Sequence, residues 1–151
     1  MRLQVRDANG TTSTVAETVQ VTQSSAQLMQ PFPVVRIAGS AKASSVTISL
    51  FTVLAPAGAR VSISCRGSGC PTKAQSLLAS AHGRHHSGTV LITFRRFERS
   101  FGVGAVLEVR VSRVGQIGKY VRFSVRRGKL PTRVDKCLSP AGVKPMNCPS
   151  S

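Results

Sequence analysis

The stretch VLEVRVSRVGQIGKYVRFSV, residues 106–125, contains two runs in which apolar and polar residues alternate. The apolar members of these runs lie two residues apart and are Leu107, Val109, Val111, Val121, Phe123 and Val125. Because successive side chains of a strand point to opposite faces of its sheet, each run predicts a strand with one apolar face. The segment GQIGK, residues 115–119, separates the runs, and we interpret it as the turn of a β-hairpin.

The same alternation recurs upstream and predicts four further strands. Their expected inward-facing residues are Val35 and Ile37, then Val46, Ile48 and Leu50, then Val61, Ile63 and Cys65, and finally Val90, Ile92 and Phe94. The 13 Gly and 8 Pro lie between such runs, where the turns of an all-β fold belong. We therefore expect an antiparallel immunoglobulin-like β-sandwich over residues 34–138, and not a parallel sheet linked by helices.

Four segments complete the expected layout. Residues 1–22 hold two alternating runs around an Asn-Gly turn and predict an N-terminal β-hairpin. Residues 23–33 end in Pro-x-Pro, which favours extended backbone, and we interpret them as an interdomain linker. Residues 72–86 fit a short helix, a weak strand or a loop. Residues 139–151 are rich in Pro and Gly, and they predict an irregular tail held only by its cysteine.

The four cysteines form two local pairs in the sequence and are Cys65, Cys70, Cys137 and Cys148. The first pair raises a zinc alternative, since Cys65-x4-Cys70-x11-His82-x3-His86 comes within one residue of the Cys2His2 spacing. Against it, alanines stand where a zinc finger needs its aromatic and leucine core residues, and Cys65 already belongs to a predicted strand.

The disulfide interpretation accounts for more of the residues. Gly67 and Gly69 allow the chain to turn, which brings Cys65 and Cys70 within the roughly 4.4–6.8 Å between Cα atoms that a disulfide requires. Two local disulfides predict an oxidising environment, outside the cell or at its surface. The chain begins MRLQVRDANG, without the apolar stretch of a signal peptide, so we expect the export signal to lie elsewhere. No run approaches the roughly 20 apolar residues of a transmembrane segment.

No catalytic constellation occurs in the sequence, and we expect a protein that is not an enzyme and has no cofactor or metal site. The segment 115–119 lacks the Gly-x4-Gly-Lys-Ser/Thr of a phosphate loop and runs directly into a strand. No Gly-x-Ser-x-Gly motif is present. With 5 acidic residues in the chain, the paired carboxylates of a glycosidase are not expected either.

The chain has 21 Lys and Arg against 5 Asp and Glu, a net charge of +16. Such a surplus attracts polyanions, because each cation near a phosphate releases counterions. The excess of Arg over Lys also fits GC-rich codon usage, so both interpretations stay open. Aromatic residues are only 5%, which disfavours a stacking platform for single-stranded nucleic acid. The candidate polyanion face comprises Arg110, Arg113, Lys119, Arg122, Arg126 and Arg127.

Two parts of the chain resemble known families. Residues 1–22 are similar to the last two strands of a PKD domain through Leu3, Val5, Asp7, Gly10, Ser13, Val19 and Val21. The segments ARVSISCRGSGCP, GVGAVLEVRVSRVGQIGKYVRFSVRRGKLP and DKCLSPAG resemble a β-rich, immunoglobulin-like module of secreted multidomain proteins of high-GC Gram-positive bacteria. The residues that carry this second likeness are Val61, Cys65, Gly67, Gly69, Cys70, Pro71, Leu107, Val109, Val111, Gly115, Ile117, Gly118, Lys119, Val125, Gly128, Pro131 and Cys137. The resemblance implies an extracellular location and an architecture, without catalytic residues.

We therefore expect a non-catalytic structural or adhesion module of a larger secreted or cell-surface protein. Its expected partners are neighbouring domains of the same polypeptide and acidic wall polymers or polysaccharides, with nucleic acid disfavoured. One alternative is a basic nucleic-acid-binding protein with the Cys2His2-like zinc site. A second alternative is an accessory binding domain of a secreted hydrolase.

Overall fold

The computed structural model describes residues 2–6, 12–16, 26–79, 84–142 and 144–150, with side chains from residue 26 onward except at 84–86. The strands are β1 (Arg2–Arg6), β2 (Thr12–Ala16), β3 (Val34–Ala41), β4 (Ser45–Pro56), β5 (Arg60–Arg66), β6 (Ala74–Leu78), β7 (Arg84–His86), β8 (Thr89–Thr93), β9 (Ser100–Gly102), β10 (Val106–Ser112), β11 (Gly118–Ser124), β12 (Thr132–Leu138) and β13 (Pro145–Met146). A 3-10 helix, η1 (Arg95–Phe97), lies between β8 and β9.

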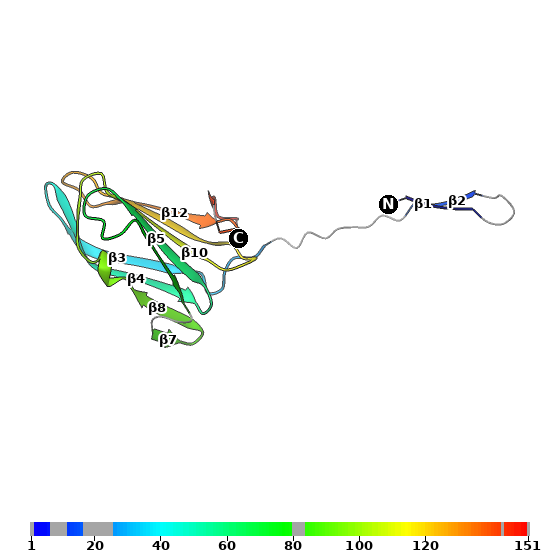
Figure 1. The fold of residues 1–151 in the computed structure, drawn as a ribbon, viewed down its shortest axis with the longest axis horizontal. Coiled ribbons are helices and arrows are strands. Elements are labelled where there is room, and N and C mark those ends of the chain that lie inside the picture. Colours follow the sequence, from blue (N-terminus) through cyan, green and yellow to red (C-terminus); the bar gives the residue numbers. More distant parts are fainter. Residues whose placement is uncertain (1, 7–11, 17–25, 80–83, 143, 151) are drawn as a thin grey trace.

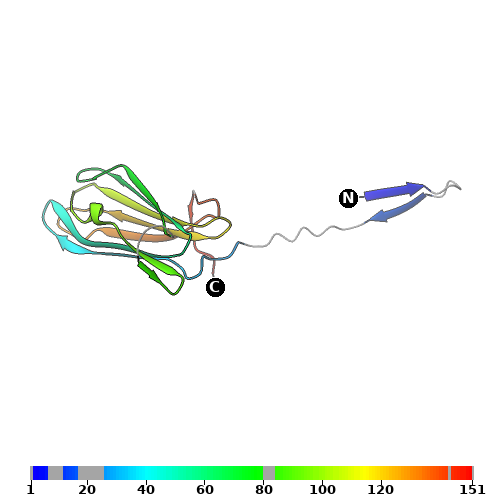
Figure 2. The same ribbon diagram turned by 60° about the horizontal axis from the view of Figure 1, so that its bottom comes forward.

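These strands pair in antiparallel sheets. β1 pairs with β2 in a sheet of its own. A six-stranded sheet has the order β13-β12-β11-β10-β5-β6, and a second sheet has the order β3-β4-β8-β7 with β9 also paired to β4. Figures 1 and 2 show the two larger sheets stacked as the layers of a sandwich. The predicted all-β fold, its antiparallel pairing and its N-terminal hairpin are confirmed.

Phe51 of β4 lies at the centre of the core between the two layers. Its ring centroid is 6.0 Å from those of Phe94 and Phe97 and 6.3 Å from that of Phe123 on β11, in the opposite sheet. All four side chains are at most 2% exposed. Since burial of one such side chain contributes roughly 1.5–3 kcal/mol, this aromatic cluster is a main link between the layers.

The predicted alternation is confirmed at nearly every position. Buried residues include Val35, Val46, Ile48, Val61, Ile63, Cys65, Val90, Ile92, Phe94, Leu107, Val109, Val111, Val121, Phe123 and Val125. The prediction for Leu50 is wrong, because its side chain is 41% exposed. The register between β3 and β4 shifts at Ala38/Gly39, so that Ser49 is an extra residue on β4. A bulge of this kind moves the following residue to the opposite face of the sheet.

Most of the described part of segment 72–86 forms the strands β6 and β7. β6 pairs with β5 at one edge of the six-stranded sheet, and β7 pairs with β8 in the other layer. The backbone N–H of Ala79 also donates to the carbonyl of Ala59, at 2.7 Å. The helix alternative for this segment is therefore wrong outside residues 80–83, which lie beyond the described ranges.

The C-terminal tail is more regular than predicted. β13 pairs with Cys137 and Leu138 of β12, and the N–H of Ser139 donates to the carbonyl of Lys144 at 2.9 Å. Both residues of β12 in this pairing are fully buried. The edge of β12 offers backbone groups that need partners, and the tail supplies them, so its cysteine is not its only attachment.

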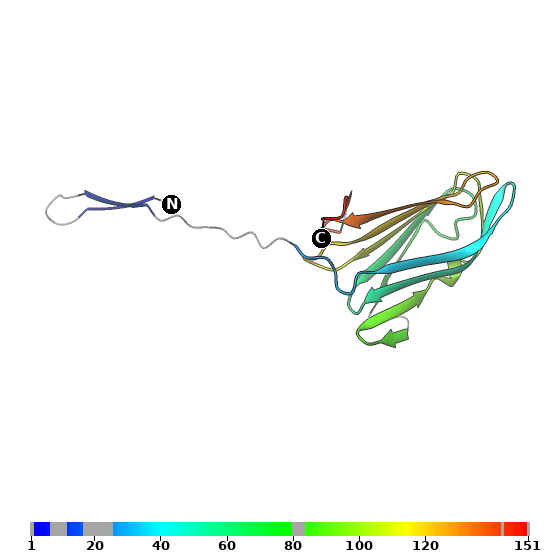
Figure 3. The same ribbon diagram turned by 180° about the vertical axis from the view of Figure 1, so that it is seen from behind.

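The predicted linker 23–33 overlaps the sandwich at its C-terminal end. The N–H of Ile117 donates to the carbonyl of Gln27, and the N–H of Met29 donates to the carbonyl of Ile117, both at 2.9 Å. The Met29 side chain is fully buried in the core. Figures 1 and 3 show this entering segment and the C-terminal tail at the same end of the sandwich.

Candidate functional site

Two disulfides staple the sandwich, and the predicted pairing is confirmed. Cys65 bonds Cys70 with 5.7 Å between their Cα atoms, and Cys137 bonds Cys148 with 4.8 Å. The first pair therefore has no free thiolates for a zinc ion, which overturns the Cys2His2 alternative. The bond between Cys65 and Cys70 decides the matter, and not the histidines, since His82, the first histidine of the motif, lies outside the described residues.

The loop closed by the first disulfide packs closely on the neighbouring layer. Gly67 and Gly69 have φ of 102° and 97°, where residues with a side chain are strained. A Cβ at Gly69 would also collide with the carbonyl oxygen of Ser100. The N–H of Gly102 donates to the carbonyl of Ser68 at 3.0 Å. The loop thus connects the end of β5 to β9 in the other sheet.

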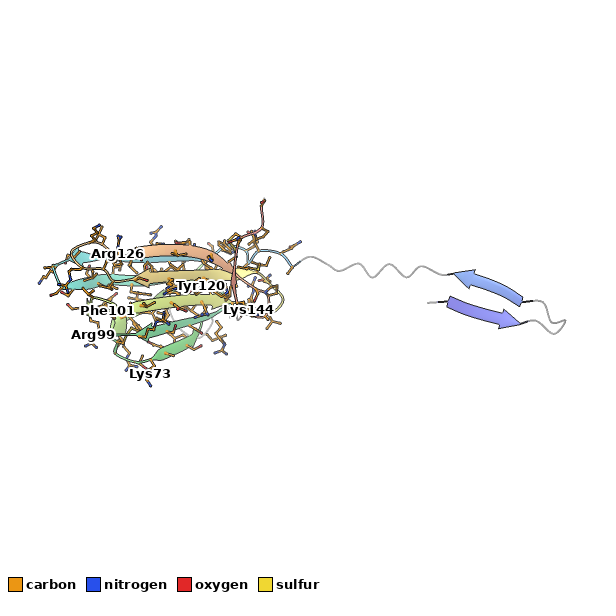
Figure 4. The ribbon with its side chains drawn as sticks, turned by 90° about the horizontal axis from the view of Figure 1, so that it is seen from above. Lys73, Arg99, Phe101, Tyr120, Arg126 and Lys144 are labelled. Atoms are coloured by element: carbon orange, nitrogen blue, oxygen red, sulfur yellow. A yellow bond between two sulfur atoms is a disulfide. The ribbon has the colours of Figure 1, made fainter. Side chains whose placement is uncertain are left out.

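The outer side of the six-stranded sheet carries the candidate site, which Figure 4 shows from above. Residues opposite one another on neighbouring strands share a face, so the register places five cations on this side of β5, β10, β11 and β12. We call this surface the basic face, and its cations are Arg60, Arg66, Arg110, Arg122 and Lys136. In Figure 4, Tyr120 lies near its centre.

Glu108 is the one carboxylate among these outward positions of the described sheet. It is directly opposite Arg122, and its Oε2 accepts an ion-pair contact of 2.9 Å from Nη2 of Arg110. Arg110 also lies over the ring of Tyr120, 5.1 Å from its centroid. Burial raises the pKa of Tyr120 above its ordinary value, and the charge and hydrogen bond of Glu108 raise it further. Tyr120 therefore stays a neutral hydrogen-bond donor at neutral pH.

A shallow cavity of about 250 Å³ lies beside this cluster. Its lining includes Ser64, Arg66, Glu108 and Arg110, so residues of positive and negative charge and a serine line it. Nearby, Nε of Arg122 is buried and has no hydrogen-bond partner in the described part of the chain. The face therefore has more donors than its own carboxylate can satisfy.

The structure brings only part of the predicted polyanion face together. Arg110 and Arg122 lie near each other in the middle of the sheet. Arg113, at one end, donates from Nε to Oε1 of Gln116 at 2.6 Å and from Nη1 to the Ala57 carbonyl at 3.2 Å. The exposed residues Arg126 and Arg127 follow β11 at the opposite end. The six residues are thus spread along the whole hairpin.

The placement of Lys119 on the polyanion face is wrong. The register sets Lys119 opposite Val111 and Cys137, both of which are buried, so its side chain is on the inner side of the sheet. Its Nζ is 3.2 Å from Oδ2 of Asp135 and 5.4 Å from the ring centroid of Phe32. Lys119 lies two residues before Val121, so the period-two alternation of β11 itself places it on the inner side.

Asp135 joins two cations at this inner edge. Its carboxylate accepts from Nε of Arg133 at 2.7 Å as well as contacting Lys119. The hydrogen bond from Arg133 is the main cause that lowers the pKa of Asp135, and Lys119 lowers it further. One carboxylate therefore offsets part of the charge of two cations away from the basic face.

Sequence reasoning missed Arg60, Arg66 and Lys136 as members of the basic face. Arg60 and Arg66 flank the alternating run of β5 in phase with its polar positions, so their signal was present, whereas TRVDKCL around Lys136 has no clear alternation. What was missing is the order of strands, because β5 is far from β10 in the sequence but pairs with it in the sheet. Register between distant strands cannot be read from alternation alone.

The fold and this surface define the class as an all-β, disulfide-stapled sandwich with a basic outer face. No family model matches the chain, no curated protein matches it, and no solved structure matches it. Among the described residues, no three His, Cys, Asp or Glu side chains gather in a way that could hold a metal ion. Within those same ranges, the chain forms no helix with the length and apolarity that a membrane crossing requires.

Proposed function

We propose that this chain is a non-catalytic structural or adhesion module of a larger secreted or cell-surface protein, and that its basic face binds acidic wall polymers or polysaccharides. The two disulfides support an oxidising, extracellular setting. The immunoglobulin-like resemblance and the PKD-like character of residues 1–22 belong to the same proposal. They make neighbouring domains of the polypeptide the expected covalent partners.

The surplus of cations on the basic face is the observation that carries the proposal. Five cations face outward there against the single carboxylate of Glu108. Arg60, Arg110 and Arg122 occupy diagonal positions on three successive strands. Diagonal neighbours in a sheet have side chains roughly 7–8 Å apart, so these arginines form a line across the sheet. A linear chain with repeated anions fits such a line better than a small, singly charged ligand does.

The arrangement of the basic face also limits repulsion among its own cations when no ligand is bound. Arg110 and Arg122 do not oppose each other directly, because Tyr120 and Glu108 stand opposite them. Glu108 offsets part of the charge, and Arg110 gains a further contact with the Tyr120 ring. We expect weak binding for each anion and useful affinity only from several together.

The test compares binding to alginate, to a poly(glycerol phosphate) wall polymer and to neutral dextran at low salt. The double variant Arg110→Ser/Arg122→Ser should bind both acidic polymers about tenfold more weakly. The control Arg95→Ser/Arg96→Ser removes the same charge from exposed residues of η1, and it should change affinity less than about twofold. Binding to both acidic polymers should weaken as salt rises.

Three results would overturn the proposal. Dextran could bind as tightly as the acidic polymers, or affinity could be independent of salt. Alternatively, the two double variants could lose affinity equally, which would assign binding to net charge and not to the basic face. Thermal melts of both variants serve as the folding control.

A further inference from the structure

A second surface, unrelated to the basic face, lies along the free edge of β3. This strand pairs with β4 on one side, and no strand of the described chain pairs with its other side. Figure 3 shows β3 along the near side of its layer, with β12 above it. At the start of this edge, Nη1 of Arg133 donates to the Val35 carbonyl at 2.9 Å. The backbone groups of Val35 therefore point away from β4.

Further along, the same edge presents backbone groups that can accept another strand. Ile37 is opposite Phe51, whose N–H is bonded to Glu98 and whose carbonyl is bonded to the N–H of Phe94. Since Phe51 thus bonds away from β3, Ile37 must point its N–H and C=O toward the free edge. Gly39 has the same orientation, because Ile48, its partner on β4, donates its N–H to the carbonyl of Arg99 and so also bonds away from β3. The described part of the chain supplies neither residue with an outward partner.

An apolar cleft opens directly beside these backbone groups. It has a volume of about 390 Å³, with Ile37 and Gly39 on one lip and Leu130 on the other. Val46 and Phe123 of the core line it as well. Ile37 is only half-buried and Leu130 is 64% exposed, so the side chains at the mouth lack full cover. An added strand would place alternate side chains in this cleft.

The charges around the edge select for an acidic occupant. Arg36 is exposed on β3 itself, and the exposed Lys42 follows the strand. Arg126 donates to the Leu130 carbonyl at the opposite lip, at 3.0 Å. The acidic residues of the described chain are already engaged, Glu98 by the Phe51 N–H, Glu108 by Arg110 and Asp135 by Arg133 and Lys119. Apart from Asp135 at one end, no carboxylate of the described residues near the cleft offsets its positive rim.

We propose that β3 binds an extended peptide segment of a partner protein as an additional strand. The segment alternates apolar side chains, which enter the cleft, with acidic side chains, which face Arg36 on the outside. The main-chain bonds to Ile37 and Gly39 provide affinity, and the alternation provides specificity. Charge complementarity favours this occupant over a second copy, because edge-to-edge pairing of two copies would bring two Arg36 side chains and two charges of +16 together.

The test uses three capped eight-residue peptides. The first alternates valine and glutamate, the second alternates valine and lysine, and the third has the first peptide's composition in two blocks. We expect the first peptide to bind tightest, by titration calorimetry, and to slow amide hydrogen exchange at Ile37 and Gly39. The third peptide, with its residues in two blocks, has the same charge as the first but no alternation. It therefore separates strand addition from general attraction to a basic protein.

Matched variants sharpen the result. Arg36→Glu should weaken binding of the first peptide about fivefold, while Arg95→Glu, an equal charge reversal on η1, should not. Leu130→Ser should also weaken it about fivefold, whereas Val114→Ser, at a residue that is 98% exposed elsewhere, should have no effect. Equal binding of the first peptide and the third, two-block peptide would overturn the proposal. So would exchange protection at Ile37 that depends on protein concentration without peptide, which would indicate pairing between copies.

Discussion

The two outer faces of the sandwich share one core but present opposite chemistry. The six-stranded sheet exposes the basic face, whereas the five-stranded sheet exposes a largely apolar face made by Val34, Leu50, Leu54 and Leu91, with Arg36 and Thr52 between them. Three of these four apolar side chains are 38–41% exposed, and Val34, Leu54 and Leu91 are directly opposite one another on β3, β4 and β8. Inward positions at the centre of both sheets are apolar, with charged residues such as Lys119 and Asp135 only toward an edge, while outward positions are free to differ.

The difference between the faces has separate local causes. On the five-stranded sheet, the bulge opposite Ala38/Gly39 turns Leu50 outward and so enlarges the apolar face. On the six-stranded sheet, the alternation of β10 and β11 continues without a bulge, and it keeps Arg110 and Arg122 outside. One face therefore repels neighbours of like charge, and the other offers a small area that water solvates poorly.

The largest expected effect comes from removing the residue that joins the layers. Phe51→Ala should lower the free energy of unfolding by about 3–5 kcal/mol, because Phe51 contacts aromatic rings of both sheets and leaves a cavity between them. Urea denaturation measures this, with Val114→Ser as a control that should leave stability unchanged. The two sheets should also melt together, since they share this core. Acidic-polymer binding that persisted above the melting temperature of the five-stranded sheet would contradict a common core.

The disulfides should contribute next, and to different extents. Replacing Cys137 and Cys148 by Ser should lower the free energy of unfolding by about 3 kcal/mol, and replacing Cys65 and Cys70 by about 2 kcal/mol. The difference arises because Cys137 and Cys148 close the longer loop, with a separation of 11 residues against 5 for Cys65 and Cys70. Denaturation of the two double variants measures the difference. The reverse order would mean that packing of the 65–70 loop against β9 matters more than loop length.

A change of the apolar face should separate the faces functionally. Leu50→Thr/Leu91→Thr should alter stability by less than about 1 kcal/mol, since both side chains are already about 40% exposed. It should also reduce binding of a hydrophobic dye and leave binding of acidic polymers unchanged. A parallel loss of polymer affinity would show that the faces are coupled through the sheets.

The smallest expected effect is on pH dependence. Arg133 and Lys119 lower the pKa of Asp135 below its ordinary value of 3.8, so their contribution is complete above that pH and is lost as pH falls through the lowered value. The carboxylate is 42% exposed, and we expect the loss to stay under about 1 kcal/mol. Acid denaturation of Asp135→Asn should lack this component. A variant with the same acid slope as the original chain would assign that slope to other carboxylates.

Much of the fold was accessible from residue order, because alternation and cysteine spacing are local signals. A period of two assigns inward and outward positions within one strand, as for Leu107 and Val109, without knowledge of the neighbours. Short spacing between Cys65 and Cys70, with glycines between them, likewise indicates a disulfide with little reference to the rest of the chain.

The functional surfaces depend on relations that only the assembled sheets define. Arg60 joins Arg110 because β5 pairs with β10, across more than 40 residues of sequence. Lys119 meets Asp135 because β11 pairs with β12 in this register. The bulge in β4 and the free edge of β3 are likewise properties of strand pairing. Period-two alternation says on which side of its own strand a residue lies, but non-local pairing decides which residues become neighbours on that side.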